Sequence, residues 1–162
     1  MKSIVPEAVC CRSHSITTSS IIVNMYDEVG IKYELNTFIR PFEGMNIYSY
    51  KAQIGKTIII PFIFEDDMWL EDSKENGKKV EYLLSDKFIA PRVLNFHPSQ
   101  LFLNTYSFNQ YSSAKEYYKD FERFREFVND KEYGVRDMFK DLIRYAREQG
   151  YNFKKISEGD WN

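Results

Sequence analysis

One apolar run constrains the fold of this chain more than any other segment. Residues 57–64 read Thr-Ile-Ile-Ile-Pro-Phe-Ile-Phe, so both faces of a strand formed here would be apolar. Such a strand is typical of a parallel sheet that helices cover on both sides. Because Pro61 cannot donate a hydrogen bond to a neighbouring strand, a bulge or a sheet edge is expected at that position.

Shorter apolar segments alternate with helical patterns on either side of this run. Strands are expected over residues 8–12, 31–38 and 92–96, and residues 17–29 are expected to form a helix that Gly30 ends. Strands that alternate with helices favour an α/β fold with a largely parallel sheet. The apolar stripe of the predicted helix consists of Ile21, Ile22, Met25 and Val29.

The other connecting segments are more polar. Residues 40–54 contain proline and glycine and predict an extended surface loop, and residues 72–79 predict a loop or a frayed helix end. Pro98 and Ser99 are expected to begin a turn after the strand at 92–96.

The last third of the chain is predicted to be helical. One helix is expected over residues 112–128 and a second from Gly134 to Gly150, and residues 153–156 could form a final short strand. The apolar faces of the two helices consist of Tyr117, Phe121, Phe124 and Val128, and of Val135, Met138, Leu142 and Tyr145.

Composition limits the classes of function. A chain of 162 residues fits one domain, and 22 basic against 24 acidic residues give no electrostatic case for nucleic-acid binding. No apolar run approaches the roughly 20 residues of a membrane span. The start lacks the apolar stretch of a signal peptide, so we expect a cytoplasmic protein. Cys10 and Cys11 are adjacent and are expected to be reduced thiols.

The chain has two histidines, and each follows a short apolar run. His14 comes directly after the strand expected at residues 8–12. His97 ends the strand expected at residues 92–96, where Pro98 holds it in an extended conformation. An imidazole that titrates near neutral pH suits proton transfer or metal binding.

Three consecutive acidic residues end the long apolar run in the same way. In parallel α/β proteins the carboxyl ends of the strands face the ligand site. Imidazoles and carboxylates at such ends are the parts that a metal-assisted hydrolase needs. The three residues are Glu65, Asp66 and Asp67.

Each of these candidates also has a simpler structural interpretation. His14 could bond to backbone at a strand end, and His97 could be no more than the residue before a turn proline. The acidic residues could form a solvated turn or a helix N-cap. Trp69 could stack on a sugar ring or pack at the rim of the core. Motifs for nucleotide cofactors or serine hydrolysis are absent from the sequence.

Three segments, in this order, resemble the polysaccharide deacetylase superfamily, and the WbmS-like branch in particular. That branch occurs in bacterial gene clusters for surface polysaccharides. The helix start at Gly134-Val135-Arg136 fits the same likeness. The three segments are Arg12-Ser13-His14-Ser15, residues 60–67, and Asn95-Phe96-His97-Pro98 followed by Leu101-Phe102-Leu103-Asn104-Thr105.

The resemblance implies a distorted (β/α) barrel and a divalent metal, commonly zinc, held by one aspartate and two histidines. A metal-bound water would attack the acetamide carbonyl of a sugar, a carboxylate would act as base, and a late histidine would protonate the leaving amine. By motif, His14 resembles a metal-binding histidine and His97 the late catalytic one, and Asp66 or Asp67 lies in the segment that supports the site.

The partners implied are a carbohydrate or a polysaccharide precursor, with no nucleic acid and no membrane span. The candidates for contacting this substrate are Arg12, Trp69 and Glu65.

The chain departs from the family pattern ahead of His14. In the family, an aspartate-rich strand end and another metal-binding histidine precede this segment, whereas here it lies close to Met1. Two histidines cannot supply both a two-histidine metal site and a separate histidine acid. We therefore expect one N-terminally truncated domain over residues 1–162, a partial barrel with open sheet edges. It would bind zinc only where the missing ligands are supplied, and would have little activity alone.

Two other functions stay open. The chain could be a non-catalytic carbohydrate-binding module that keeps an aromatic cleft. It could also be a structural half that pairs with itself, or with a separate N-terminal fragment, through its open sheet edges.

Overall fold

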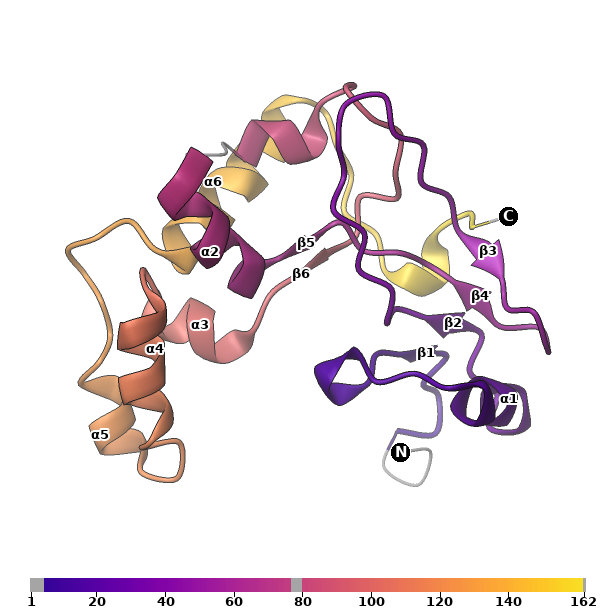
Figure 1. Cartoon of the computed structure of the whole chain (residues 1–162), viewed down its shortest axis with the longest axis horizontal. Helices are drawn as coiled ribbons and strands as arrows, with labels where there is room; N and C mark the ends of the chain where they lie inside the picture. The colour runs from indigo at the N-terminus through magenta and orange to yellow at the C-terminus, as the bar shows by residue number, and fades with distance from the viewer. Residues whose placement is uncertain (1–4, 77–79, 162) are drawn as a thin grey trace. The chain divides into compact units, whose positions relative to one another are not determined.

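The computed structural model describes residues 5–76 and 80–161 and has a mixed α/β fold with mainly parallel strand pairing (Figure 1). The chain divides into two compact units. Unit 1 comprises Met1–Ile63, Asp86–Val93 and Phe153–Asn162, and unit 2 comprises Phe64–Ser85 and Leu94–Asn152. Each unit is described by itself below.

Unit 1 is built on a four-stranded sheet in the order β1-β2-β4-β3. The strands β1 (Cys10–Cys11), β2 (Tyr33–Glu34) and β4 (Ile58–Ile59) are parallel, as predicted, and β3 (Tyr50–Lys51) pairs antiparallel with β4. The prediction of a surface loop over residues 40–54 was wrong, because the segment contributes β3 and the buried side chains of Ile47 and Ala52.

Helix α1 (Ser20–Glu28) follows β1 and begins three residues later than expected, because the Ser19 side chain caps it by accepting a hydrogen bond from the Ile22 amide. Gly30 follows it in the left-handed conformation, with φ of 70°. The predicted apolar stripe is not buried: Ile21 is 72% exposed and Met25 52% exposed, whereas Tyr26 is the buried residue of the helix. In the described part of the chain, no element covers this stripe.

The long apolar run is interrupted as a strand at Pro61, as expected for a residue that has no amide hydrogen to donate to a neighbouring strand. Strand β4 ends at Ile59, Phe62 forms an isolated parallel bridge to Phe38, and β5 (Phe64–Glu65) starts a separate sheet. The run is almost fully buried, with Ile60 and Phe62 at most 1% exposed. The boundary between the two units falls within the same run, between Ile63 and Phe64.

Unit 2 begins with β5, which pairs in parallel with β6 (Leu94–Asn95). Helix α2 (Asp66–Asn76) and the 3-10 helix η2 (Val80–Leu84) follow β5. Of the two alternatives predicted for residues 72–79, a loop or a helix end, the segment to Asn76 is the end of a helix, and residues 77–79 lie outside the described residues. Pro98 begins helix α3 (Pro98–Leu103) and not a turn, because proline suits the first helical position.

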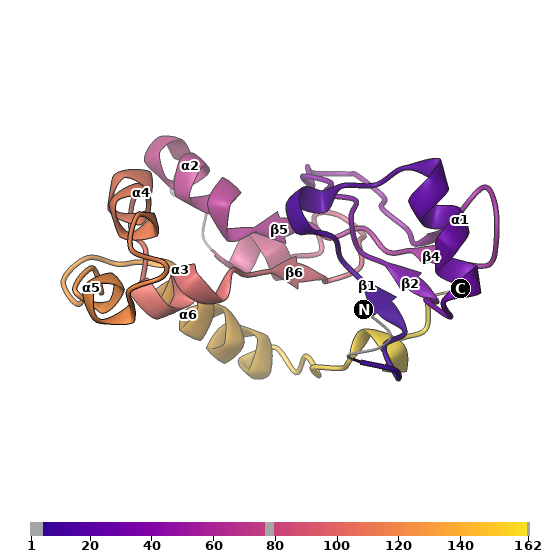
Figure 2. The same ribbon diagram turned by 90° about the horizontal axis from the view of Figure 1, so that it is seen from below.

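The helix predicted over residues 112–128 is two helices, α4 (Phe108–Lys115) and α5 (Phe121–Arg125). Ser107 and Asp120 cap them, each through its side-chain oxygen. Helix α6 (Val135–Glu148) matches the prediction from Gly134, and it lies against α3 (Figure 2). Its buried residues include Val135, Met138 and Leu142, as predicted.

The predicted C-terminal strand is absent, since residues 153–155 have no regular structure and the 3-10 helix η3 (Ile156–Glu158) follows. Phe153 is 64% exposed there, so it has no strand or core to join. Among the described residues, no helix is long and apolar enough to cross a membrane.

Candidate functional site

The parallel register of β5 and β6 brings two of the predicted segments together in unit 2. Phe64 lies opposite Leu94, and Glu65 lies opposite Asn95. The residues that follow each strand are therefore neighbours as well, and Asp66, at the start of α2, meets His97, just before α3. The strand ends carry the candidate side chains, as the α/β arrangement predicts.

Asp66 is fully buried and holds His97 by two contacts. Its Oδ2 accepts a hydrogen bond from the His97 backbone amide at 2.7 Å, and its Oδ1 lies 2.6 Å from Nδ1 of the imidazole. The Asp67 amide also donates to Oδ1, at 3.0 Å. A carboxylate bound to both the backbone and the ring fixes the imidazole and leaves Nε2 as the outer nitrogen.

The surroundings raise the proton affinity of His97. The hydrogen bond to Asp66 raises the pKa of the imidazole above its ordinary value; burial opposes this, and the nearby charges of Asp66, Asp67 and Glu65 add to it. The side chain of His97 is 31% exposed, so Nε2 exchanges protons in a ring that the carboxylate holds in place.

Glu65 and Asp67 flank the histidine. Oε1 of Glu65 lies 3.9 Å from Nε2 of His97, and Oδ2 of Asp67 lies 3.9 Å from Nδ1. Each has a polar neighbour that the sequence analysis did not select: Asn95 donates to Glu65 at 2.9 Å, and the buried Gln100 donates to Asp67. The alternation of β6 could have identified Asn95, which stands two residues before His97.

The metal implied by the resemblance can be tested against these residues. In the described residues, one cluster has three ligand atoms within 4.8 Å of one another, and it consists of Glu65, Asp67 and His97. It contains two carboxylates and one histidine, and Nδ1 of that histidine already contacts Asp66. The cluster therefore differs from the implied set of one aspartate and two histidines, and the residues present do not build the family site.

The remaining candidate site residues are His14, Arg12 and Trp69. His14 and Arg12 belong to unit 1, where His14 is exposed in the 3-10 turn η1 (His14–Ile16) and the Arg12 guanidinium lies 5.5 Å from the centre of the Phe62 ring. Trp69 is on α2 in unit 2, and its ring lies 6.2 Å from that of Tyr133. Within unit 2 the structure thus groups Glu65, Asp66, Asp67 and His97.

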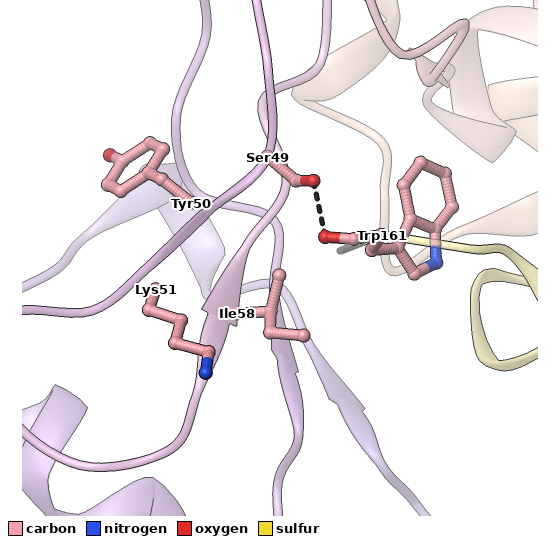
Figure 3. A pocket seen from close by; sticks show the side chains of 5 residues that line it. All are labelled: Ser49, Tyr50, Lys51, Ile58 and Trp161. Carbon is pink, nitrogen blue, oxygen red and sulfur yellow. Dashed lines mark hydrogen bonds between the residues drawn. The ribbon is translucent and has the colours of Figure 1, made fainter.

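Unit 1 also contains a pocket of about 300 Å³. Figure 3 shows that the Ser49 hydroxyl, on the segment leading into β3, points at the backbone oxygen of Trp161, to which it donates at 2.7 Å. The indole of Trp161 lies on one side of Figure 3, and the Tyr50 ring points away from it on the other. The pocket is lined by Ser49, Tyr50, Lys51, Ile58 and Trp161.

Comparison with known proteins identifies a family and a fold. The model of the WbmS-like polysaccharide deacetylase family matches residues 1–115. A search of curated proteins gives no match. A crystal structure from Bordetella bronchiseptica, of a protein provisionally assigned as a polysaccharide deacetylase of O-antigen biosynthesis, superimposes with a TM-score of 0.76 at 24% identity.

The superposition covers 89% of this chain and 58% of the Bordetella chain, so the present chain spans well under two thirds of that relative. At this identity the likeness establishes the fold alone. The family match covers more than half of the residues and includes both histidine segments. The chain belongs to the WbmS-like polysaccharide deacetylase family.

Proposed function

We propose that this chain serves the removal of N-acetyl groups from sugars of a bacterial surface polysaccharide. Hydrolysis of an acetamide breaks a carbon–nitrogen bond, and the amine leaves readily only when its nitrogen gains a proton. His97 is the proton donor in this proposal, and Asp66 holds its ring and raises the pKa of the imidazole above its ordinary value.

The Asp66–His97 pair is the observation that carries the proposal. The Asp66 carboxylate is fully buried, 2.6 Å from the partly exposed imidazole of His97. Burying a charged group costs free energy, and this cost favours a functional role for the pair. Asp67 is proposed to act with Asp66 beside the ring of His97, from which its Oδ2 lies 3.9 Å away, and Glu65 is proposed to contact the substrate. Arg12 and Trp69 are further candidates for substrate contact.

His14 is proposed as one ligand of the divalent ion, zinc in the first instance. The other histidine and the aspartate of the family pattern would come from polypeptide outside these 162 residues. The same polypeptide would add the strands that close a (β/α) barrel. We propose accordingly that the 162-residue chain alone has little deacetylase activity, and that it works in the cytoplasm on a polysaccharide precursor.

A chimera tests this function directly. The chain would replace the matched region of the Bordetella relative, and acetate release from an N-acetylated surface polysaccharide would be measured with zinc present. We expect release from the chimera, little from the chain alone, and a loss of about 100-fold or more in His97→Gln, because a positioned proton donor contributes at least that factor. Tyr106→Phe, an exposed change in the same unit, is the control.

Two results would count against the proposal. Equal acetate release by the chimera with and without His97→Gln would remove His97 from the chemistry. Zinc-dependent release by the 162-residue chain alone would contradict its proposed inactivity, while leaving the role of His97 to be tested in that chain.

A second candidate function is carbohydrate binding without catalysis. The pocket beside Trp161 favours it, because about 300 Å³ bordered by two aromatic residues and a lysine suits one sugar unit bearing a negative charge. Titration with acidic surface glycans should then saturate, and Lys51→Gln should weaken the binding. A lack of binding at millimolar glycan would exclude this function.

A third candidate is a structural half that associates through its open surfaces. Strand β1 lies at one end of the four-stranded sheet, and the apolar stripe of α1 is exposed in the same unit. Either a second copy or a separate N-terminal fragment could cover them.

A further inference from the structure

The turn that carries His14 has an unusual backbone. Ser15 and Ile16 both have positive φ, 54° and 47°. Residues other than glycine seldom adopt this conformation, and a β-branched isoleucine does so least of all. Such a backbone persists only where the surrounding structure holds it, and it is concentrated at functional sites.

Asn36 binds both sides of the turn. Its Oδ1 accepts a hydrogen bond from the Ser13 amide at 2.8 Å and lies 3.1 Å from the Ser13 hydroxyl oxygen, which donates to the Thr17 carbonyl oxygen at 2.5 Å. Its Nδ2 lies 3.5 Å from the Thr17 carbonyl oxygen. Ser13 precedes His14, and Thr17 follows the two strained residues, so one buried amide ties together the start and the end of the turn.

Glu34 supports Asn36 from β2. Its Oε1 accepts hydrogen bonds from Asn36 Nδ2 and from the Thr18 hydroxyl, both at 2.8 Å. Glu34 is 2% exposed and Asn36 4% exposed. The parallel register places Glu34 opposite Cys11, at the end of β1, and this brings the pair to the turn that β1 leads into.

A buried carboxylate is a costly way to stabilise a turn. Apolar side chains of similar volume usually stabilise a protein as well as or better than a buried charged group. A carboxylate that accepts two hydrogen bonds instead fixes the positions of both donors. The arrangement is therefore suited to positioning more than to stability.

We infer that Glu34 and Asn36 are positioning residues for His14, which hold its strained turn at the end of β1. This inference rests on the proposed function of His14 as a metal ligand. A ligand that enters the site already oriented loses less conformational freedom when the ion binds. Loosening the turn would consequently weaken metal binding without touching the imidazole.

The two histidines make the test simple, because ¹⁵N-histidine labels two backbone amides, His14 in unit 1 and His97 in unit 2. In Asn36→Ala, we expect the order parameter of the His14 amide to fall from about 0.85, typical of rigid backbone, to below about 0.6. The His97 amide should not change. Glu34→Gln retains an oxygen that can accept both hydrogen bonds and should resemble the natural chain.

Thr57→Val is the matched control, since Thr57 is fully buried in the same unit and bonds to Ile31 and not to the turn. If Asn36→Ala does not fold, Thr18→Val removes a hydrogen bond to Glu34 at an exposed position and should lower the His14 order parameter by a smaller amount. An unchanged His14 amide in the folded variant, or an equal change in Thr57→Val, would overturn the inference.

A zinc titration separates this inference from the proposed function. In the chimera, whose Bordetella part would supply the other ligands, half-maximal acetate release should need a higher zinc concentration with Asn36→Ala than without it. If the zinc requirement does not change while Asn36→Ala still loosens the turn in the 162-residue chain, His14 is not a metal ligand and the positioning of the turn stands. If Asn36→Ala leaves the turn rigid, the positioning fails whatever zinc does.

Discussion

At the scale of single residues, the contact between Asp66 and His97 determines how this site holds protons. The carboxylate accepts a hydrogen bond from the backbone amide and contacts the ring nitrogen of the same histidine, so the ring cannot rotate without breaking its contact with Oδ1. A histidine held in this way keeps one defined nitrogen for exchange with a substrate.

Asp66→Asn should lower the pKa of His97, because it removes the hydrogen-bonding carboxylate that is the largest cause of the raised value. A histidine NMR titration measures this directly. Asp67→Asn is the control and should have a smaller effect, since Asp67 lies 3.9 Å from Nδ1 and Asp66 lies 2.6 Å from it. An unchanged pKa in Asp66→Asn would contradict the assignment.

The same variant carries a prediction about stability. Because the pKa of His97 is raised on folding, its contribution to the free energy of unfolding is complete below about pH 6.5, the value for unfolded chains, and is lost as the pH rises through the folded value. The loss of stability in Asp66→Asn should therefore be larger at pH 5.5 than at pH 9. Urea unfolding at both pH values would show the difference.

At the scale of elements, one of the segments that carry the family resemblance has a structural role. Asn104, left-handed with φ of 51°, follows α3 and accepts hydrogen bonds from the Arg136 and Asp137 amides at the start of α6. Gly134 has no side chain to cap these amides, and the Asn104 oxygen replaces the missing cap. The Asn104 hydrogen bond also lowers the pKa of Asp137.

Gly134→Ala should destabilise the protein by at least about 2 kcal/mol, because the added Cβ would lie 2.2 Å from the Asn104 carbonyl oxygen and displace the cap of α6. Thermal and urea unfolding would measure the loss. Gly44→Ala is the control: its Cβ would meet nothing within 4 Å, and a left-handed alanine there should cost about 1 kcal/mol. Equal losses in the two variants would contradict this explanation.

The elements also show what could be predicted from the sequence. Helix α6 was predicted correctly because its own apolar face is the one that becomes buried. The helix over residues 112–128 was predicted wrongly because Tyr117 and Phe127 stack in one cluster although the backbone is interrupted between α4 and α5. Local periodicity describes which side chains share a core, and not whether one helix supplies them.

Part of the candidate site could likewise be predicted from the sequence, and part could not. The acidic strand end and both histidines were visible in the sequence, because polar residues after apolar runs are a local signal. The choice between Asp66 and Asp67 as the residue bonded to His97 could not be made, since it depends on the pairing of β5 with β6 across about thirty residues. The buried pair of Asn36 and Glu34 was missed for the same reason.

At the scale of the whole molecule, unit 1 exposes apolar side chains of a kind that a monomeric protein would normally bury. Ile21, Met25 and Val29 lie on one face of α1 and are between 40% and 72% exposed. Contiguous apolar surface of this kind marks interaction sites or drives aggregation.

Met25→Lys should therefore reduce self-association of the chain, because a charge in the middle of the exposed stripe opposes its burial against a second copy. Sedimentation velocity over a range of concentrations would compare the variant with the natural chain. Lys32→Gln, a polar change beyond the end of α1, is the control. A natural chain that stays monomeric at all concentrations without a partner would contradict self-association.

The division into two units has a consequence for the gene. The chain passes from one unit to the other after Ile63, Ser85, Val93 and Asn152, so neither unit corresponds to one uninterrupted stretch of coding sequence. A single stop codon or a single new start codon cannot yield either unit by itself. Recombination could transfer them separately only after the order of the coding segments had been rearranged, so the two units are inherited together.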